Sequence, residues 1–173
     1  PEQYDMTDSG SMQHVAQICR NTGIEIVAYH AHKTDFAGID GAALSEEQRL
    51  ARVDICRRQI GTLLELGADA NYGDHAGFPS LIAALTCADR VDMYEILELL
   101  LAHGADIQQR GHNDYTPLHW AVAERNIEAA EFLLAHGADP NASTGIDDCA
   151  TPLEEAEILG LNDIAEAMRK LTG

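Results

Sequence analysis

Histidine and aspartate side chains gather near the start of the chain, at His14, His30, His32 and Asp35. Zinc takes three or four converging ligands of these types, so the group could hold a metal if the segment is irregular. On a helix, however, His30 and His32 would diverge, because residues two apart do not share a face. A metal-binding or enzymatic protein that uses this irregular N-terminal region is therefore an alternative interpretation of the sequence.

Other candidate groups offer less chemistry. His103 and His136 stand in equivalent Ala-His-Gly-Ala-Asp segments, one repeat apart and so too distant for a single ion. Cys149 follows Asp147 and Asp148 but has no histidine nearby in sequence to activate its thiol. The sequence contains no Ser/His/Asp order, no glycine-rich phosphate loop and no paired catalytic carboxylates. We therefore predict no catalytic residue, no metal ligand, no cofactor and no enzymatic activity.

The acidic composition restricts the class of partner. There are 29 acidic against 11 basic side chains, giving a formal net charge of −18. This charge opposes binding to nucleic acid or to a membrane surface, because both require Lys and Arg against phosphate. It favours a partner protein with a basic patch, or it serves solubility alone. An acidic inhibitor that competes with nucleic acid for a basic target is a further alternative.

Cysteine use and hydropathy predict a cytoplasmic protein. The four cysteines have no metal-binding or paired spacing, which is typical of free thiols in a reducing compartment. No run of 18 apolar residues and no N-terminal signal pattern occurs. We expect a monomer.

The tripeptide Gly-Ala-Asp begins at Gly67, Gly104 and Gly137, at intervals of 37 and 33 residues. Each copy follows a leucine-rich apolar run. A period of this size predicts a stack of one supersecondary unit, which works through the surface it exposes.

The clearest unit extends from residue 112 to residue 142. Its sequence predicts a helix capped by Thr116 with Pro117 at the first position, then a second helix capped by Asn126. Gly137 should end the second helix in a left-handed conformation. Two short helices cannot bury their apolar faces alone, so the unit requires neighbours.

Residues 116–121, Thr-Pro-Leu-His-Trp-Ala, and the segment 133–141 together resemble the ankyrin repeat. The next unit shares Thr-Pro-Leu at Thr151, whereas the earlier units match less well. The resemblance implies an all-α solenoid of four to five helix–turn–helix units joined by β-turn or hairpin loops. It also implies a structural role for His119, which should bond Thr116 and a neighbouring backbone group.

We expect residues 1–11 to be poorly ordered and residues 12–173 to form a single ankyrin-repeat domain. Its predicted units are an eroded N-terminal unit at 12–43, repeats at 44–74, 75–111 and 112–146, and a C-terminal capping repeat at 147–173. Glu166, Arg169 and Lys170 suit a cap with a solvated outer face.

The resemblance implies a non-enzymatic adaptor or inhibitor that binds a partner protein through its concave face. That face is formed by the inner helices and by the fingers, which are the turns that project between the units. The candidate contact residues are His75, Ala76, Phe78, Thr86, Cys87, His112, Asn113, Tyr115, Ala123, Glu124, Asp147 and Asp148, with Ile158 and Leu159 equivalent in the last unit. Two interpretations of Phe78 and Tyr115 remain open: the rings are interface anchors, or they fold back onto their own repeats.

Overall fold

In the computed structural model, each leucine-rich run that precedes a Gly-Ala-Asp tripeptide is a helix. The structure describes residues 60–73, 78–85, 90–145 and 150–172, together with the isolated positions 17, 54, 57 and 58. The predicted disordered segment 1–11 and eroded unit 12–43 lie outside these residues, except for Gln17. The chain divides into two compact units, Pro1–Ala70 and Asn71–Gly173.

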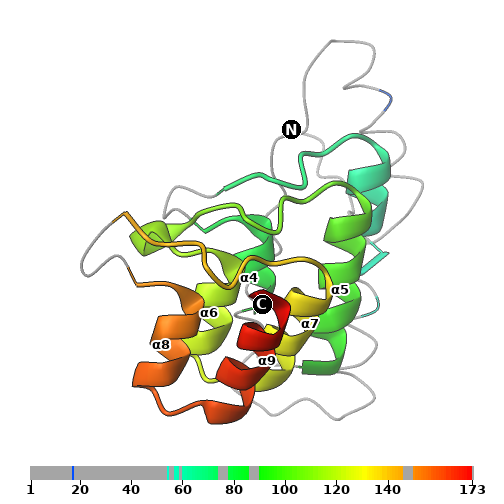
Figure 1. Cartoon of the computed structure of the whole chain (residues 1–173). Helices are drawn as coiled ribbons and strands as arrows, with labels where there is room; N and C mark the ends of the chain where they lie inside the picture. Colours follow the sequence, from blue (N-terminus) through cyan, green and yellow to red (C-terminus); the bar gives the residue numbers. More distant parts are fainter. Residues whose placement is uncertain are drawn as a thin grey trace, which may run out of the picture. The chain divides into compact units, whose positions relative to one another are not determined.

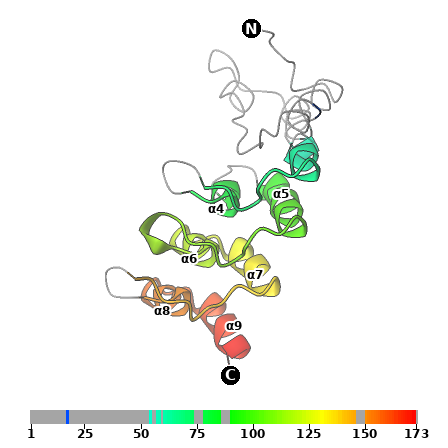
Figure 2. The ribbon, with the colours of Figure 1, turned by 90° about the horizontal axis from the view of Figure 1, so that it is seen from above.

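The helices of the second unit alternate between an inner and an outer row. The elements in chain order are α4 (Ser80–Leu85), α5 (Arg90–Ala102), the short 3-10 helix η2 (His112–Asp114), α6 (Pro117–Ala123), α7 (Ile127–Ala135), α8 (Pro152–Ile158) and α9 (Asn162–Thr172). Helices α4, α6 and α8 form the inner row, and α5, α7 and α9 form the outer row (Figure 1). Figure 2 shows the three pairs stacked one after another. This is the predicted all-α ankyrin architecture.

The predicted caps define where the helices begin. Thr116 caps α6 and accepts a hydrogen bond from the backbone N–H of His119 at 3.4 Å. Asn126 caps α7 through the N–H of Ala129 at 3.2 Å. Thr151 and Glu154 cap each other reciprocally at the start of α8. Each cap satisfies backbone donors that the first helical turn leaves open.

Gly67, Gly104 and Gly137 end three helices in the same way, with φ angles of 92°, 86° and 90°. After each glycine, the next N–H donates to a carbonyl five residues earlier, as Ala138 does to Leu133 at 3.0 Å. A left-handed residue at this position is the helix ending that the sequence predicts.

The core of the second unit is aliphatic and continuous between the rows. Its most buried large side chains are those of Leu81, Ile82, Met93, Leu97, Leu118, Leu133, Ile164 and Met168. Polar side chains also join consecutive repeats along the turns: the amide of Asn71 donates to the carbonyl of Gly104 at 3.0 Å, and that of Gln108 donates to the carbonyl of Gly137 at 3.3 Å. Each repeat is therefore also bonded to the next one along the turns.

None of the helices in the described ranges is long and apolar enough to cross a membrane.

Candidate protein-binding surface

Of the twelve candidate contact residues, six lie in the described part of the chain, as do their equivalents in the last unit, Ile158 and Leu159; the six are Phe78, His112, Asn113, Tyr115, Ala123 and Glu124. The other six, which are His75, Ala76, Thr86, Cys87, Asp147 and Asp148, lie outside it, as do His14, His30, His32 and Asp35. The six described residues lie in the finger around η2, just before α4 and α6, and at the end of α6.

The ring of Phe78 packs within its own stack. It is half-buried, meets Trp120 edge-on with ring centroids 5.4 Å apart, and stacks on His112 at 6.2 Å. Trp120 is the chain's only tryptophan. A ring in this position supports the inner surface and offers only part of its area to a partner.

Tyr115 also folds back onto the stack. Its half-buried ring stacks on His119 with centroids 5.2 Å apart, and its hydroxyl donates to Oε1 of Glu155 on α8 at 3.3 Å. Burial raises the pKa of Glu155, and the hydrogen bond from Tyr115 opposes that shift. The side chain thus links one finger to the inner helix of the next repeat.

His119 has the structural role that the resemblance implies. Its Nδ1 accepts the N–H of Thr116 at 3.2 Å, so Nε2 carries the proton and donates to the carbonyl of Ala150 at 3.2 Å. The side chain is fully buried. Both nitrogens are engaged in joining two repeats, and the imidazole has no free edge for acid–base catalysis.

The tip of this finger is held by an ionic contact that the sequence analysis did not find. Asn113 and Asp114 both have φ near 58°, a left-handed conformation rare outside glycine. The carboxylate of Asp114 accepts from Nη1 of Arg110 at 2.8 Å and from the backbone N–H of Gly145 in the following loop. These bonds fix the tip, on which His112 and Asn113 are exposed. The sequence signal for this contact is weak, because Asp114 and its partner Gly145 are 31 residues apart.

The ends of the inner helices provide the most open part of the surface. Ala123 and Glu124 are exposed at the end of α6. At the end of α8, Ile158 is 80% exposed, more than any other large apolar side chain in the described residues. Among the predicted positions that are described, exposure is therefore greatest on the finger tip and the helix ends.

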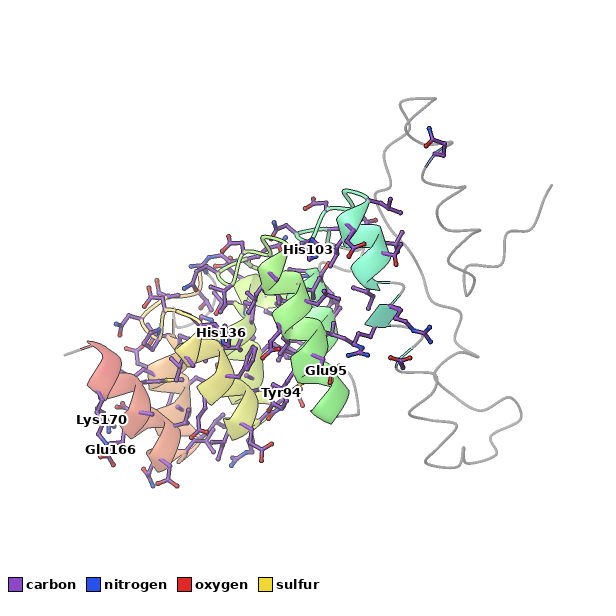
Figure 3. The ribbon with its side chains drawn as sticks, turned by 90° about the vertical axis from the view of Figure 1, so that its right-hand side faces the viewer. Tyr94, Glu95, His103, His136, Glu166 and Lys170 are labelled. Atoms are coloured by element: carbon purple, nitrogen blue, oxygen red, sulfur yellow. The ribbon has the colours of Figure 1, made fainter. Side chains whose placement is uncertain are left out.

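Among the described side chains of the outer helices, no chemical groups converge on one site. Figure 3 shows His103 and His136 just after the ends of the outer helices α5 and α7. His136 donates through Nδ1 to the carbonyl of Phe132 at 2.8 Å and packs on that residue's ring at 4.1 Å. Nowhere in the part of the chain that the structure describes do three His, Cys, Asp or Glu side chains come together to suit a metal ion.

A family model described as "Ankyrin repeats (3 copies)" matches residues 53–144. Protein phosphatase 1 regulatory subunit 27 of Mus musculus is 34% identical over 86 residues, covering 50% of this chain and 56% of that protein. BCL-6 corepressor-like protein 1 of Homo sapiens is 30% identical over 112 residues, or 65% of this chain and 6% of that protein.

L-asparaginase of Dirofilaria immitis is 43% identical over 86 residues, or 49% of this chain. The match spans only 14% of that protein, so the activity in its name is not assigned to the matched segment. The chain spans about half of the phosphatase subunit and a much smaller part of the other two relatives.

Proposed function

The chain belongs to the ankyrin-repeat family, and on that premise we propose that it is a non-enzymatic adaptor or inhibitor of another protein. Ankyrin repeats are protein-interaction modules, and the relatives include a protein named as a regulatory subunit and one named as a corepressor. The partner binds the concave side, across the finger tip and the ends of the inner helices.

The exposure pattern is the observation that carries this proposal. His112 and Asn113 are exposed on a finger whose backbone is fixed by Asp114, and Ala123 and Glu124 are exposed at the end of the helix that follows. Exposed residues on a fixed backbone are well suited to binding, since little conformational entropy is lost when the partner docks.

The charge supports a partner with a basic surface patch. The net charge of −18 would accelerate encounter with such a protein and repel phosphate-rich nucleic acid and anionic membrane. Association should slow as salt is added, because exposed charges are screened beyond about 8 Å at physiological ionic strength. The protein would act as a monomer in the cytoplasm, consistent with its scattered cysteines.

Affinity capture with two matched double variants tests the proposal. Ala123→Arg/Glu124→Lys changes the end of α6, and Ala135→Arg/Glu131→Lys makes the same changes at exposed positions of outer helix α7. A partner identified by mass spectrometry should be captured by the native chain and the α7 variant, and lost with the α6 variant. Equal capture by both variants would move the interface away from the inner helices.

A further inference from the structure

Ile158 is exposed at the end of α8, and the preceding inner helix, α6, has a residue in the equivalent position. Helices α6 and α8 are both seven residues long, and Ala123 and Ile158 are their last residues. Ala123 is exposed even though α8 packs against α6. A further repeat stacked on α8 in the same way would therefore leave Ile158 uncovered.

The last repeat has polar residues where stacking would bury apolar ones. Val122 and Leu134 are buried in the preceding pair. The equivalent positions of the last pair, counted from each helix start, are Glu157 and Arg169. Arg169 donates to Glu157 through Nη2 at 2.6 Å and Nε at 3.2 Å. Solvated positions of this repeat are thus generally polar, which makes an isoleucine beside Glu157 unusual.

Carboxylates lie on the same helix face as Ile158 and at the end of the neighbouring inner helix. Glu154 and Glu155 precede it by one helical turn and share its face of α8. Glu124 is exposed at the end of the adjacent inner helix. Two cations oppose these groups: Arg125 in the turn after α6, and Arg169, which is bound to Glu157. The environment of Ile158 is therefore negative, with an apolar centre.

We infer that Ile158 is an anchor position for a segment of a partner protein that presents an apolar side chain flanked by Lys or Arg. The apolar side chain covers the isoleucine, and the flanking cations meet the carboxylates of α8 and α6. This inference rests on the proposed function, since it gives the chemistry of the partner at the concave surface. Contact with an apolar side chain supplies affinity, and the charges supply rate and selectivity.

A random dodecapeptide library displayed on phage is the probe. It is selected against the full chain, and the selected peptides are then measured by fluorescence anisotropy against variants. Ile158→Asp removes the anchor, and Ile127→Asp is the matched control. Among the residues that the structure describes, Ile127 is the other exposed large apolar residue, at 38%, and it begins outer helix α7. Both substitutions add one negative charge, so any loss confined to Ile158→Asp reflects the apolar contact. Thermal melting of each variant, together with the milder substitution Ile158→Ala, shows whether a loss of binding is caused by misfolding.

Selected peptides should carry an apolar residue beside Lys or Arg. Their affinity should fall about tenfold or more with Ile158→Asp and change less than about twofold with Ile127→Asp. Peptides without basic residues, or peptides bound equally by Ile158→Asp, would overturn the inference. If peptides of either of these two kinds no longer bind the Ala123→Arg variant, the concave surface is still a peptide-binding surface, and only the assignment of Ile158 as the anchor is wrong. If no selected peptide depends on either Ile158 or Ala123, both proposals fail.

Discussion

Three hydrogen bonds join Thr116 and His119 at the start of α6: the N–H of Thr116 donates to Nδ1 of His119, the N–H of His119 donates to Oγ1 of Thr116, and the hydroxyl of Thr116 donates to Nδ1 at 2.9 Å. The first of these bonds requires Nδ1 to be unprotonated. Nε2 then donates to Ala150, which makes the neutral tautomer part of the contact between two repeats.

Acidification should therefore destabilise the fold through His119. Burial lowers the pKa of His119 below its ordinary value of 6.5, and the bond to Ala150 only partly opposes this shift. Below about pH 6.5 the unfolded chain binds a proton at His119 that the folded chain does not bind. The stability that neutral His119 contributes is therefore fully present above about pH 6.5 and is lost as the pH falls below it. Through this one group, the free energy of unfolding should fall by at most about 1.4 kcal/mol per pH unit.

Urea unfolding from pH 8 to pH 5 measures this effect. His119→Gln should be less stable at pH 8 and should show a shallower loss of stability below pH 6.5. Identical pH profiles for the native chain and His119→Gln would assign the acid sensitivity to other groups.

Gly137→Ala should destabilise the protein by about 1–2 kcal/mol, because φ is 90° there and an L side chain resists that conformation. Gly73→Ala is the control: at both glycines an added Cβ meets no atom within 4 Å, but only Gly137 has a left-handed φ. Thermal melting of the two variants separates backbone strain from crowding. A Gly73→Ala variant as unstable as Gly137→Ala would contradict this explanation.

Phe78→Ala should lower the free energy of unfolding by about 1–2 kcal/mol, less than for a fully buried ring, because its contact with Trp120 is lost. The emission of Trp120 should change as well. Phe78→Leu should retain most of the stability. Unchanged urea midpoints for Phe78→Ala, together with weakened partner binding, would instead favour the interpretation of Phe78 as an interface anchor.

Glu157→Val/Arg169→Leu should promote self-association, because it restores at the last helix pair the apolar residues that stack in the preceding pair. Sedimentation velocity should show a concentration-dependent dimer or larger species. The charge-swapped variant Glu157→Arg/Arg169→Glu keeps a polar pair and should match the native chain. Breaking the pair alone should cost little, since exposed ion pairs contribute about 0–1 kcal/mol.

The local signals in the sequence predicted the fold well. Thr116, Asn126 and Gly137 act through bonds to residues a few positions away, so their roles can be read from short segments. The contacts of Asp114 with Gly145 and of Tyr115 with Glu155 cross from one repeat to the next. Such contacts depend on how two repeats are stacked, and no local pattern encodes them.

The candidate surface was only partly predictable for the same reason. The exposed ends of α6 and α8 follow from repeat register, whereas the exposed fraction of an aromatic ring depends on its neighbours. Phe78 meets Trp120, which lies 42 residues further along the chain. Sequence periodicity could identify Phe78 and Tyr115 as equivalent positions, but not the side chains that cover their rings.

The nearest-neighbour packing of the helix pairs has a mechanical consequence. Helix α8 packs chiefly on α6 and α9, and α9 packs chiefly on α7 and α8. A force applied to the C-terminal end of this unit could therefore peel off the α8–α9 pair while the contacts between α4 and α6 stay intact. Extension should proceed in steps of roughly one repeat, and the pair nearest the pulling point should yield first.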